Sequence, residues 1–573
     1  MDDMTSLFIP NRFTCIHSVN LIACYKYNEN PDILTLQGLM DNRCNALPRN
    51  SIGTIDIKSL VVFLYSRKIR LLLHSSAIDK TMEFMNRDNT ILVCLLLVIL
   101  HFSTFISNAQ VNQPSNWLPE RTFNTNELIK DFEVFKGSLE AFHPGLYWYT
   151  SKKELDEIFA DTRASLKDSL SELAFFRKLT FITSKIRCGH TVVRTSIPTR
   201  DYISKEGKLL PFEIKILNGK MYMLESRIDK KLPIRPGMEI LKINEFTVDS
   251  LLQLASAVIS GDGFIETNKI KRFEKNFPFF YVSRFGPTNN YKIDYLNQEG
   301  EKESTQINAY PAGLLNAKKA SKKNLKLSFP VKNTALLRVR QFQNWKEGRK
   351  RFRFEKELKA MFEKISTSKV ENLVIDMRDN LGGDDNFGLR LFSYLYDKPI
   401  IEFKEQTLIA NKSKYFRYTK KLNRTKAMFY HMFATKKGYD NRFYMRNAKT
   451  LKPSRPSFPQ FSGSVYILVN GGTYSTGADF VSLMKSYKLA TFIGDEAGGA
   501  YYGNTSGFLV TVKLPNSKLR LILPLVNYRT NVEPIEKIGR GVTPDFPISA
   551  SIKDLMDGID TELEFTLQHI KNK

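Results

Sequence analysis

The apolar residues of the chain follow three spacing patterns in turn, and the first is helical. Between residues 125 and 187 apolar side chains recur every three or four positions, as in Leu128, Phe132 and Phe135. This spacing places them on one face of a helix. We predict three helices here and assign residues 110–200 to an N-terminal helical region.

From about residue 209 the pattern changes to that of short strands. Residues 211–216 and 221–224 alternate apolar and polar side chains, and Asn218-Gly219 between them is a strong hairpin signal. A helical pattern over residues 248–259 follows. We therefore assign residues 201–313 to a small β-rich domain.

Beyond residue 333 strands alternate with helices, which predicts an α/β layer on a largely parallel sheet. We assign residues 330–573 to this α/β core. Residues 403–460 interrupt it with a basic, aromatic and Pro-bearing insertion, which we interpret as a strap or lid over a site. The predicted strands are 335–339, 373–376, 465–469 and 491–494, and the predicted helices are 348–365 and 476–487.

The N-terminal part differs from the rest of the chain. Residues 85–109 begin with a basic Met-Asn-Arg segment, continue with an apolar run over 91–100 and end in a small residue, Ala109. This is the layout of a signal peptide, so we expect export to a periplasmic or extracellular location. Residues 1–84 would then be a mis-called upstream extension. The alternative is a genuine cytoplasmic extension followed by an internal membrane anchor.

Composition narrows the class of protein. Of 573 residues, 42% are hydrophobic and 25% are charged, which is typical of a globular chain. The formal net charge of +26 indicates a solvated basic surface, with peripheral contact to anionic membrane lipid or acidic peptides as the functional alternative. Nucleic-acid binding is not expected, because no zinc-finger spacing or aromatic-rich binding signature accompanies the charge. After export the chain would keep one cysteine, Cys188, and therefore no intramolecular disulfide.

Residues 471–479 place a serine where it can act as a nucleophile. A predicted buried strand is followed by two glycines, and Ser475 then stands at the start of a helix. Free backbone N–H groups and the positive end of the helix would lie beside its hydroxyl, and they can stabilise an oxyanion. The alternative interpretation is that Ser475 only caps the helix.

Two further segments could complete such a site. Residues 376–383 also follow a buried strand, and Gly382 and Gly383 would let the backbone approach a substrate carbonyl. His190 stands between a glycine and a strand, and histidine titrates near neutral pH, as a general base must. Cys188 is interpreted as a packing residue instead of a rival nucleophile.

Together these segments resemble the C-terminal-processing/tricorn family of serine peptidases. The resemblance implies an N-terminal helical region, a PDZ-like domain and a crotonase-like α/β core whose serine forms an acyl-enzyme with a peptide or protein substrate. The matching stretches, in the order of the family, are Gly189 to Thr191, Pro236 to Asn244, Val374 to Gly383, Thr473 to Asp479 and Gly539 to Asp545.

The family has two kinds of site, and this chain is similar to the tricorn kind. A serine–lysine dyad is not expected, because residues 494–503 contain no lysine. In the tricorn pattern His190 is the base, although Gly189 stands where that pattern has a serine. A late glutamate completes the pattern, and both Glu533 and Glu536 fit it. The resemblance implies no metal or cofactor.

The expected mechanism uses His190 to take the proton of Ser475. The N–H of Thr476 and that of Gly382 or Gly383 would hold the oxyanion. One alternative is a non-catalytic relative that binds peptides or apolar ligands, and another is an envelope protein that binds anionic lipid through its basic surface. The sequence does not determine the oligomeric state.

Overall fold

The computed structural model separates the chain into two compact units, residues 1–113 and 114–573. In the first unit, β1 (Phe13–Ser18) and β2 (Leu21–Lys26) form an antiparallel hairpin. The predicted signal peptide and all other residues of the predicted upstream extension lie outside the described residues. None of the helices in the described part combines the length and apolar character needed to cross a membrane. The described residues are 13–18, 21–26, 121–228, 230–315, 323–347, 349–409, 413–419, 425, 434–446 and 448–573.

The three helices predicted near the start of the second unit are confirmed. Asn124 caps the first with a reciprocal bond to Glu127, and Ser151 caps the second. Their apolar faces pack on strands from the far end of the chain, and one short strand, β5, pairs with β24. This pairing brings the segment after the third helix, which contains His190, against the C-terminal part. The elements are β3 (Thr122–Phe123), α4 (Thr125–Phe142), α5 (Lys152–Ala164), β4 (Leu170–Ser171), α6 (Glu172–Ile186), β5 (Val192–Arg194) and α7 (Ile197–Glu206).

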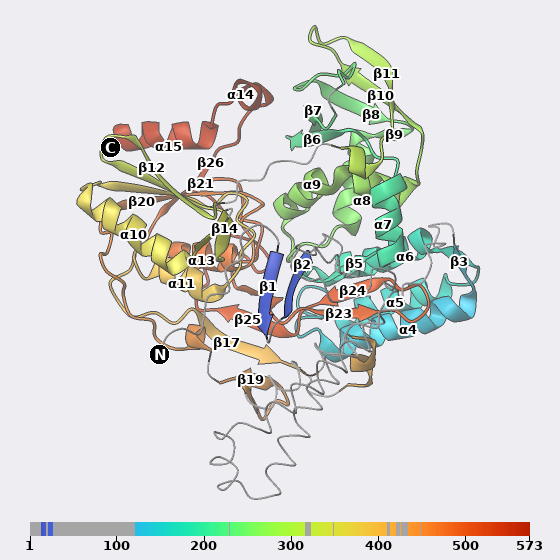
Figure 1. The fold of residues 1–573 in the computed structure, drawn as a ribbon, viewed down its shortest axis with the longest axis horizontal. Coiled ribbons are helices and arrows are strands. Elements are labelled where there is room, and N and C mark those ends of the chain that lie inside the picture. The colour runs from blue at the N-terminus through green and yellow to red at the C-terminus, as the bar shows by residue number, and fades with distance from the viewer. Residues whose placement is uncertain are drawn as a thin grey trace, which may run out of the picture. The chain divides into compact units, whose positions relative to one another are not determined.

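The β-rich region forms a sheet of six strands in the order β11-β10-β8-β7-β6, with β9 beside β8. The predicted hairpin is confirmed, since Asn218 and Gly219 take φ values of 50° and 77° at its turn. Two helices cover the sheet (Figure 1). The elements are β6 (Phe212–Leu217), β7 (Lys220–Ser226), β8 (Glu239–Ile243), β9 (Phe246–Thr247), α8 (Val248–Val258), α9 (Glu266–Phe285), β10 (Asn290–Leu296) and β11 (Lys302–Asn308).

Helix α9 was not predicted, although it spans 20 residues. Its buried aromatic residues Phe273, Phe277 and Phe280 do have helical spacing. Pro278 lies inside the helix, and a proline at that place favours a break when only the sequence is considered. Tertiary packing against the sheet outweighs this local preference.

The α/β layer is a six-stranded sheet in the order β12-β13-β16-β20-β21-β26, parallel except for the β12–β13 pair. The predicted buried strands are confirmed, but the helix expected from residue 348 begins at Phe354, because the preceding residues form the hairpin β14–β15. The elements are β12 (Leu325–Val331), β13 (Thr334–Val339), β14 (Trp345–Glu347), β15 (Lys350–Phe352), α10 (Phe354–Thr367), β16 (Asn372–Asp376), α11 (Asp385–Phe392), β20 (Ser464–Val469), α13 (Thr476–Ser486), β21 (Thr491–Gly494), β26 (Phe546–Pro547), α14 (Ile552–Asp557) and α15 (Thr561–Lys571).

The described residues of the predicted insertion 403–460 contribute strands to a second sheet, in the order β18-β19-β17-β25-β22. A third sheet, β23-β24-β5, receives the helical region. The mixed α/β class with several sheets is therefore confirmed. The elements are β17 (Phe403–Leu408), β18 (Thr435–Lys437), β19 (Phe443–Met445), β22 (Gly503–Ser506), β23 (Val510–Lys513), β24 (Arg520–Leu523) and β25 (Val526–Thr530), with short 3₁₀ turns at Ala312–Leu314, Lys414–Tyr418 and Lys449–Leu451.

Candidate active site

Ser475 occupies a strained turn between β20 and helix α13. Its backbone angles are φ 55° and ψ −133°, which a residue with a side chain rarely adopts. It stands at the capping position, yet its side chain accepts no capping hydrogen bond and is partly exposed. A serine on a sharp strand-to-helix turn presents its hydroxyl away from the sheet, as in a nucleophile elbow. The interpretation as a helix cap alone does not explain this geometry.

Hydrogen bonds tie this turn to the one that follows the neighbouring parallel strand β16. The N–H of Tyr474 donates to the carbonyl of Asn380 over 2.8 Å, and Thr473 Oγ1 donates to the carbonyl of Met377 over 2.9 Å. Asn380 is fully buried, and its Nδ2 donates to the carbonyl of Val339. The two turns therefore hold each other in place.

Gly382 packs directly against the serine. A Cβ added there would lie 2.7 Å from Ser475 Cβ and 2.9 Å from the nitrogen of Thr476, and the φ of Gly382 is +90°. Only glycine fits without displacement of these atoms. The N–H of Gly382 already donates to Asn380 Oδ1 over 2.8 Å.

Two other N–H groups near Ser475 remain uncommitted. Neither the N–H of Thr476 nor that of Gly383 makes a hydrogen bond to any group in the described part of the chain. Thr476 Oγ1 lies 3.1 Å from the carbonyl oxygen of Gly383, which keeps the two residues together. Of the predicted oxyanion donors, Thr476 and Gly383 are thus the ones with a free N–H.

His190 stacks on Tyr474, the residue before the serine, with ring centres 4.8 Å apart. Its Nδ1 lies 3.0 Å from Tyr474 Oη, and the same hydroxyl donates to Asp262 Oδ1 over 3.0 Å. Asp262 Oδ1 also accepts the N–H of Gly189 over 2.7 Å. A chain of contacts therefore runs from the imidazole through the phenol to a buried carboxylate.

Helix α9 and its preceding loop position these groups. Arg272 donates from Nη1 to the carbonyl of Gly189 over 2.8 Å, and its guanidinium lies over the ring of Tyr474. The loop that carries Asp262 is fixed on both sides, because the N–H of Gly263 donates to Arg187 and that of Phe264 donates to Gly539. The long helix missed from the sequence is thus part of the site's support.

Burial controls the protonation of these groups. It lowers the pKa of His190 to about 3, with Arg272 and His143 acting in the same direction, although part of the residue's surface is exposed. It raises the pKa of Asp262, and it raises the pKa of Tyr474 well above its ordinary value, with the Asp262 charge adding to the effect. The imidazole is therefore neutral and the phenol is protonated near pH 7. The expectation that His190 titrates near neutral pH is not met in this structure, in which the ring is a weaker base than an ordinary histidine.

These contacts assign the proton on the imidazole. With the Tyr474 hydrogen directed to an ionised Asp262 carboxylate, the phenol oxygen accepts from His190, and this hydrogen-bond network assigns the ring proton to Nδ1. Nε2 then has a free lone pair. This is the tautomer that a general base acting through Nε2 needs.

The structure brings some predicted site residues together and separates others. Ser475, Thr476, Gly382 and Gly383 form one cluster, with His190 stacked on the adjoining tyrosine. Within the described residues no hydrogen bond joins Ser475 Oγ to His190.

The two glutamates have other partners. Glu533 is exposed, and its main-chain N–H donates to Ser486 Oγ, while the Glu536 carboxylate accepts two bonds from Thr543. No contact joins either carboxylate to His190 in the part of the chain that is described. The carboxylate that does lie beside the imidazole, Asp262, was missed, because Gly261-Asp262-Gly263 is typical of a surface turn in the sequence.

Cys188 is next to His190 but is not an activated thiol. It is 4% exposed, and its Sγ lies 2.9 Å from Thr505 Oγ1. Burial raises its pKa to about 11, so the thiol keeps its proton near neutral pH. This agrees with its interpretation as a packing residue instead of a nucleophile.

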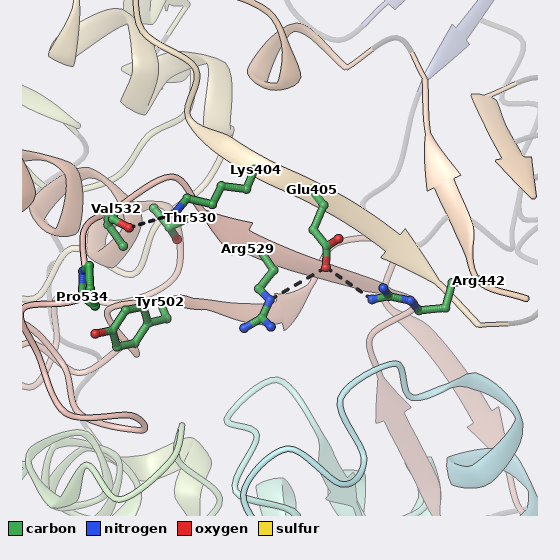
Figure 2. A pocket seen from close by; sticks show the side chains of 8 residues that line it. All are labelled: Lys404, Glu405, Arg442, Tyr502, Arg529, Thr530, Val532 and Pro534. Atoms are coloured by element: carbon green, nitrogen blue, oxygen red, sulfur yellow. Dashed lines mark hydrogen bonds and ion pairs between the residues drawn. The ribbon is translucent and has the colours of Figure 1, made fainter. Parts of the chain in front are cut away.

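An open groove of about 530 Å³ lies on strands β17 and β25 (Figure 2). Glu405 lies between Arg442 and Arg529, at 3.3 Å and 3.8 Å, and Lys404 donates to the carbonyl of Val532. None of the predicted site residues lines this groove, although Pro534 at its edge follows Glu533. It is therefore a surface separate from the serine cluster.

Comparisons with known proteins indicate a family and a fold. The model of peptidase family S41 matches residues 333–548, which contain the serine and both glycine turns. Mature CPAF complexed with lactacystin has a similar fold, with a TM-score of 0.56 and 13% identity over 78% of this chain and 99% of that one. Another structure of mature CPAF gives a TM-score of 0.52 and 14% identity over 75% of this chain and 94% of that one. No curated protein sequence matches this chain.

The two structural likenesses concern the fold, and the family model concerns the region that contains Ser475 and the two glycine turns. The expectation from the five ordered sequence motifs agrees with both. Residues 333–548 therefore match peptidase family S41, the C-terminal-processing family, and these comparisons support a serine-type peptidase.

Proposed function

We propose that the chain is an exported peptidase that hydrolyses peptide bonds with Ser475 as nucleophile and His190 as general base. The observation that carries this proposal is the backbone of Ser475, strained at φ 55° and ψ −133° with an uncapped hydroxyl at a helix start. Strain of this kind persists where the surrounding structure enforces it, which occurs most often at active sites. The layout of residues 85–109 supports export.

In the proposed first step, His190 Nε2 takes the proton of Ser475 as its oxygen attacks the substrate carbonyl. The negative oxygen that forms is held by the free N–H groups of Thr476 and Gly383. His190 then gives its proton to the leaving amine, and water hydrolyses the acyl-enzyme by the reverse sequence. Tyr474 and Asp262 position the imidazole and do not contact the reacting atoms.

This mechanism includes a movement. Proton transfer needs a separation of about 2.6–3.2 Å, and no hydrogen bond joins Ser475 to His190 among the described residues. The proposal therefore requires the two side chains to meet when substrate binds. Catalytic hydrogen bonds often form only in that complex.

The same proposal extends to the domains. We propose that residues 201–313 form a PDZ-like domain that adds a peptide strand to a sheet edge, and that residues 330–573 form a crotonase-like core. The covered six-stranded sheet and the parallel sheet that leads into α13 support these assignments. Peripheral contact of the basic surface with anionic lipid remains part of the proposal.

A fluorophosphonate that labels active serines tests the proposed function. The wild-type chain should be labelled, Ser475→Ala should not react, and labelling of His190→Ala should fall by about a hundredfold or more. The matched control is Ser482→Ala, since this serine lies in the same helix and its hydroxyl is fully buried and makes no hydrogen bond to a described group. A folded wild-type chain that does not react would instead favour the non-catalytic, peptide-binding relative.

A further inference from the structure

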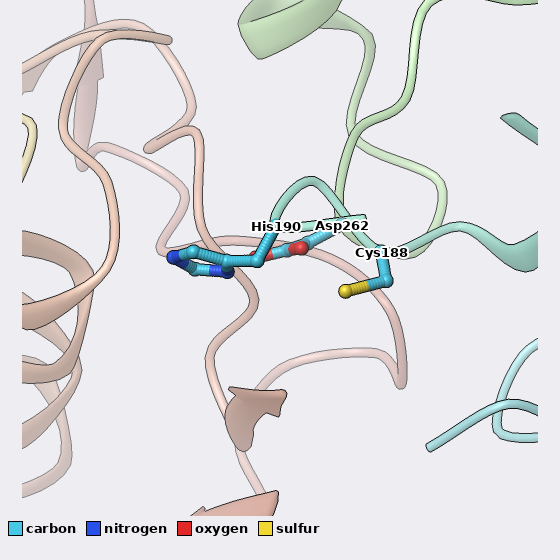
Figure 3. Close-up of side chains that lie close together, drawn as sticks. All are labelled: Cys188, His190 and Asp262. Atoms are coloured by element: carbon cyan, nitrogen blue, oxygen red, sulfur yellow. The ribbon is translucent and has the colours of Figure 1, made fainter. Parts of the chain in front are cut away.

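Three side chains with metal-binding atoms meet behind the candidate base. One ligand atom each from Cys188, His190 and Asp262 lies within 4.8 Å of the other two. Figure 3 shows the Asp262 carboxylate between the imidazole and the thiol, with the outer part of the ring pointing away from both. It is the only such group of three or more among the residues that the structure describes.

Peptide hydrolysis leaves part of this cluster unexplained. Asp262 is 3% exposed, and its Oδ2 makes no well-formed hydrogen bond in the described part of the chain, although the N–H of Ala500 lies close enough to the carboxyl to lower its pKa. A buried carboxylate oxygen without a partner is destabilising, so its presence needs a reason. The thiol of Cys188 has no part in the proposed mechanism either.

There is room for an ion-sized ligand at this place. Cys188, Asp262, Asn504 and Thr505 contribute to the lining of a small cavity of about 10 Å³. This is enough for about one water molecule. Arg187 also lines the cavity, whereas His190 does not and lies on the other side of the Asp262 carboxylate (Figure 3). Asn504 Oδ1 is a second buried oxygen without a partner among the described groups. Asp262 Oδ2, Asn504 Oδ1 and the Cys188 sulfur, once deprotonated, can each supply a lone pair to a cation.

We propose that Cys188 Sγ, His190 Nδ1 and Asp262 Oδ2 form an inhibitory site for a thiophilic divalent cation such as Zn²⁺. The ligand set favours Zn²⁺ or Cd²⁺ over Mg²⁺ or Ca²⁺, because thiolate and imidazole are soft ligands. In a tetrahedral zinc site the ligand atoms lie about 3.5 Å apart, so the side chains must close by about 1 Å. On binding, the thiol proton is released to solvent, and water or Asn504 Oδ1 takes the fourth position.

The inhibitory effect follows from the tautomer of His190 and therefore rests on the proposed function. Without metal, Nδ1 carries the proton and Nε2 has the lone pair that accepts the proton of Ser475. A metal bound to Nδ1 uses a lone pair on that nitrogen. The ring proton must then move from Nδ1 to Nε2. The base is then blocked, although no atom of Ser475 has been touched.

Metal binding is tested on the chelator-treated full chain by adding Cd²⁺ and measuring the ultraviolet charge-transfer absorption of the thiolate–Cd²⁺ bond. The wild-type signal should exceed that of Cys188→Ser by one bound ion per chain, and Asp262→Asn should bind at least about tenfold more weakly. The other four cysteines are present in every variant, so the difference isolates Cys188. Serine can keep the hydrogen bond to Thr505, which guards against loss of the fold. Equal signals in wild type and a folded Cys188→Ser would overturn the proposal.

Inhibition is tested by measuring the rate of fluorophosphonate labelling at increasing Zn²⁺ concentrations. The rate of each variant is compared with the rate of the same variant without metal. The Zn²⁺ concentration for half-inhibition should rise at least about tenfold in Cys188→Ser. If wild type is labelled but both proteins are inhibited equally, the metal site is wrong and the peptidase proposal stands. If no labelling occurs but the Cd²⁺ signal depends on Cys188 and Asp262, the metal site stands and the peptidase proposal fails.

Discussion

The two halves of the candidate site are constructed differently. The Ser475 half consists of two turns that follow adjacent parallel strands, β16 and β20, and they are joined by hydrogen bonds through Asn380. The His190 half combines the end of the helical region, a loop of the β-rich region and Tyr474.

The difference has a consequence for motion and for mutation. Ser475, the proposed nucleophile, is fixed to the core sheet, so its geometry should survive changes in the other regions. The position of His190, the proposed base, depends on how two other regions pack against that sheet, and packed regions can shift relative to one another. We therefore expect the alignment of His190, not the backbone of Ser475, to respond to distant changes.

The largest effect is expected from Gly382→Ala, which changes the Ser475 half of the candidate site. The added methyl group would overlap Ser475 Cβ and the nitrogen of Thr476, so the N–H proposed as an oxyanion donor would be displaced. Loss of one such donor lowers kcat about a hundred- to a thousandfold. Steady-state hydrolysis of a casein-type substrate measures this.

Gly300→Ala is the matched control for this prediction. Gly300 has a similar φ of +84°, but no atom lies within 4 Å of its added Cβ. It therefore imposes the same backbone strain without a clash at the site. Equal losses in the two variants would show that strain, and not the oxyanion geometry, is responsible.

A smaller effect is expected from Tyr474→Phe, which changes the His190 half of the candidate site. It removes the hydroxyl between His190 and Asp262 and so weakens the preference for the productive tautomer. We expect kcat/KM to fall about ten- to a hundredfold, which is less than most of the 10²–10⁴-fold range that a general base contributes, because the base itself is kept. Asp262→Asn should act similarly, and the double variant should show little further loss, because both changes break one chain of contacts.

The variants Glu533→Gln and Glu536→Gln test whether Asp262 or a late glutamate positions His190. The family pattern favours the glutamate. If Asp262 positions the base, each glutamine variant should stay within about twofold of wild type, since neither carboxylate contacts His190. A loss as large as that of Tyr474→Phe in either variant would return the positioning role to that glutamate. The pH profile of kcat/KM separates the outcomes further, since only a positioning residue should alter its acidic limb.

The last prediction concerns the pH dependence of the free energy of unfolding. It arises from His143, a neighbour of His190 whose pKa is also lowered by burial. His143 is 1% exposed, and burial lowers its pKa to about 3. Since this folded value lies below the unfolded value of about 6.5, the unfolded chain binds protons first as the pH falls. The free energy of unfolding should therefore drop by about 2 kcal/mol between pH 7 and pH 5 from this residue alone.

Urea unfolding at pH 7, 6 and 5 measures this slope, with His143→Asn as the comparison. The amide oxygen of asparagine can accept the N–H of Gly145, as His143 Nδ1 does, but it does not titrate. The slope of the variant should be smaller by the stated amount. An unchanged slope would mean that His143 is accessible to protons in the folded chain.

Much of the fold could be predicted from local patterns. The three helices, the Asn218-Gly219 hairpin and the buried strands of the α/β layer have strong periodic or turn signals, and each is present. Helix α9 was missed because Pro278 opposes it locally, while its aromatic face is stabilised only by the sheet on which it packs. The helix expected from residue 348 starts later, because the hairpin β14–β15 takes up its first residues.

The sequence by itself determined the Ser475 half of the site. A buried strand, a glycine turn and a serine at a helix start require particular backbone angles and exposed N–H groups, and these are properties of neighbouring residues. Only the tertiary structure decided which carboxylate faces His190. Asp262 lies 73 residues from Gly189, and Tyr474 lies 284 residues from His190. Their meeting depends on how the loop around Gly263 packs between Arg187 and Gly539, which no local pattern encodes.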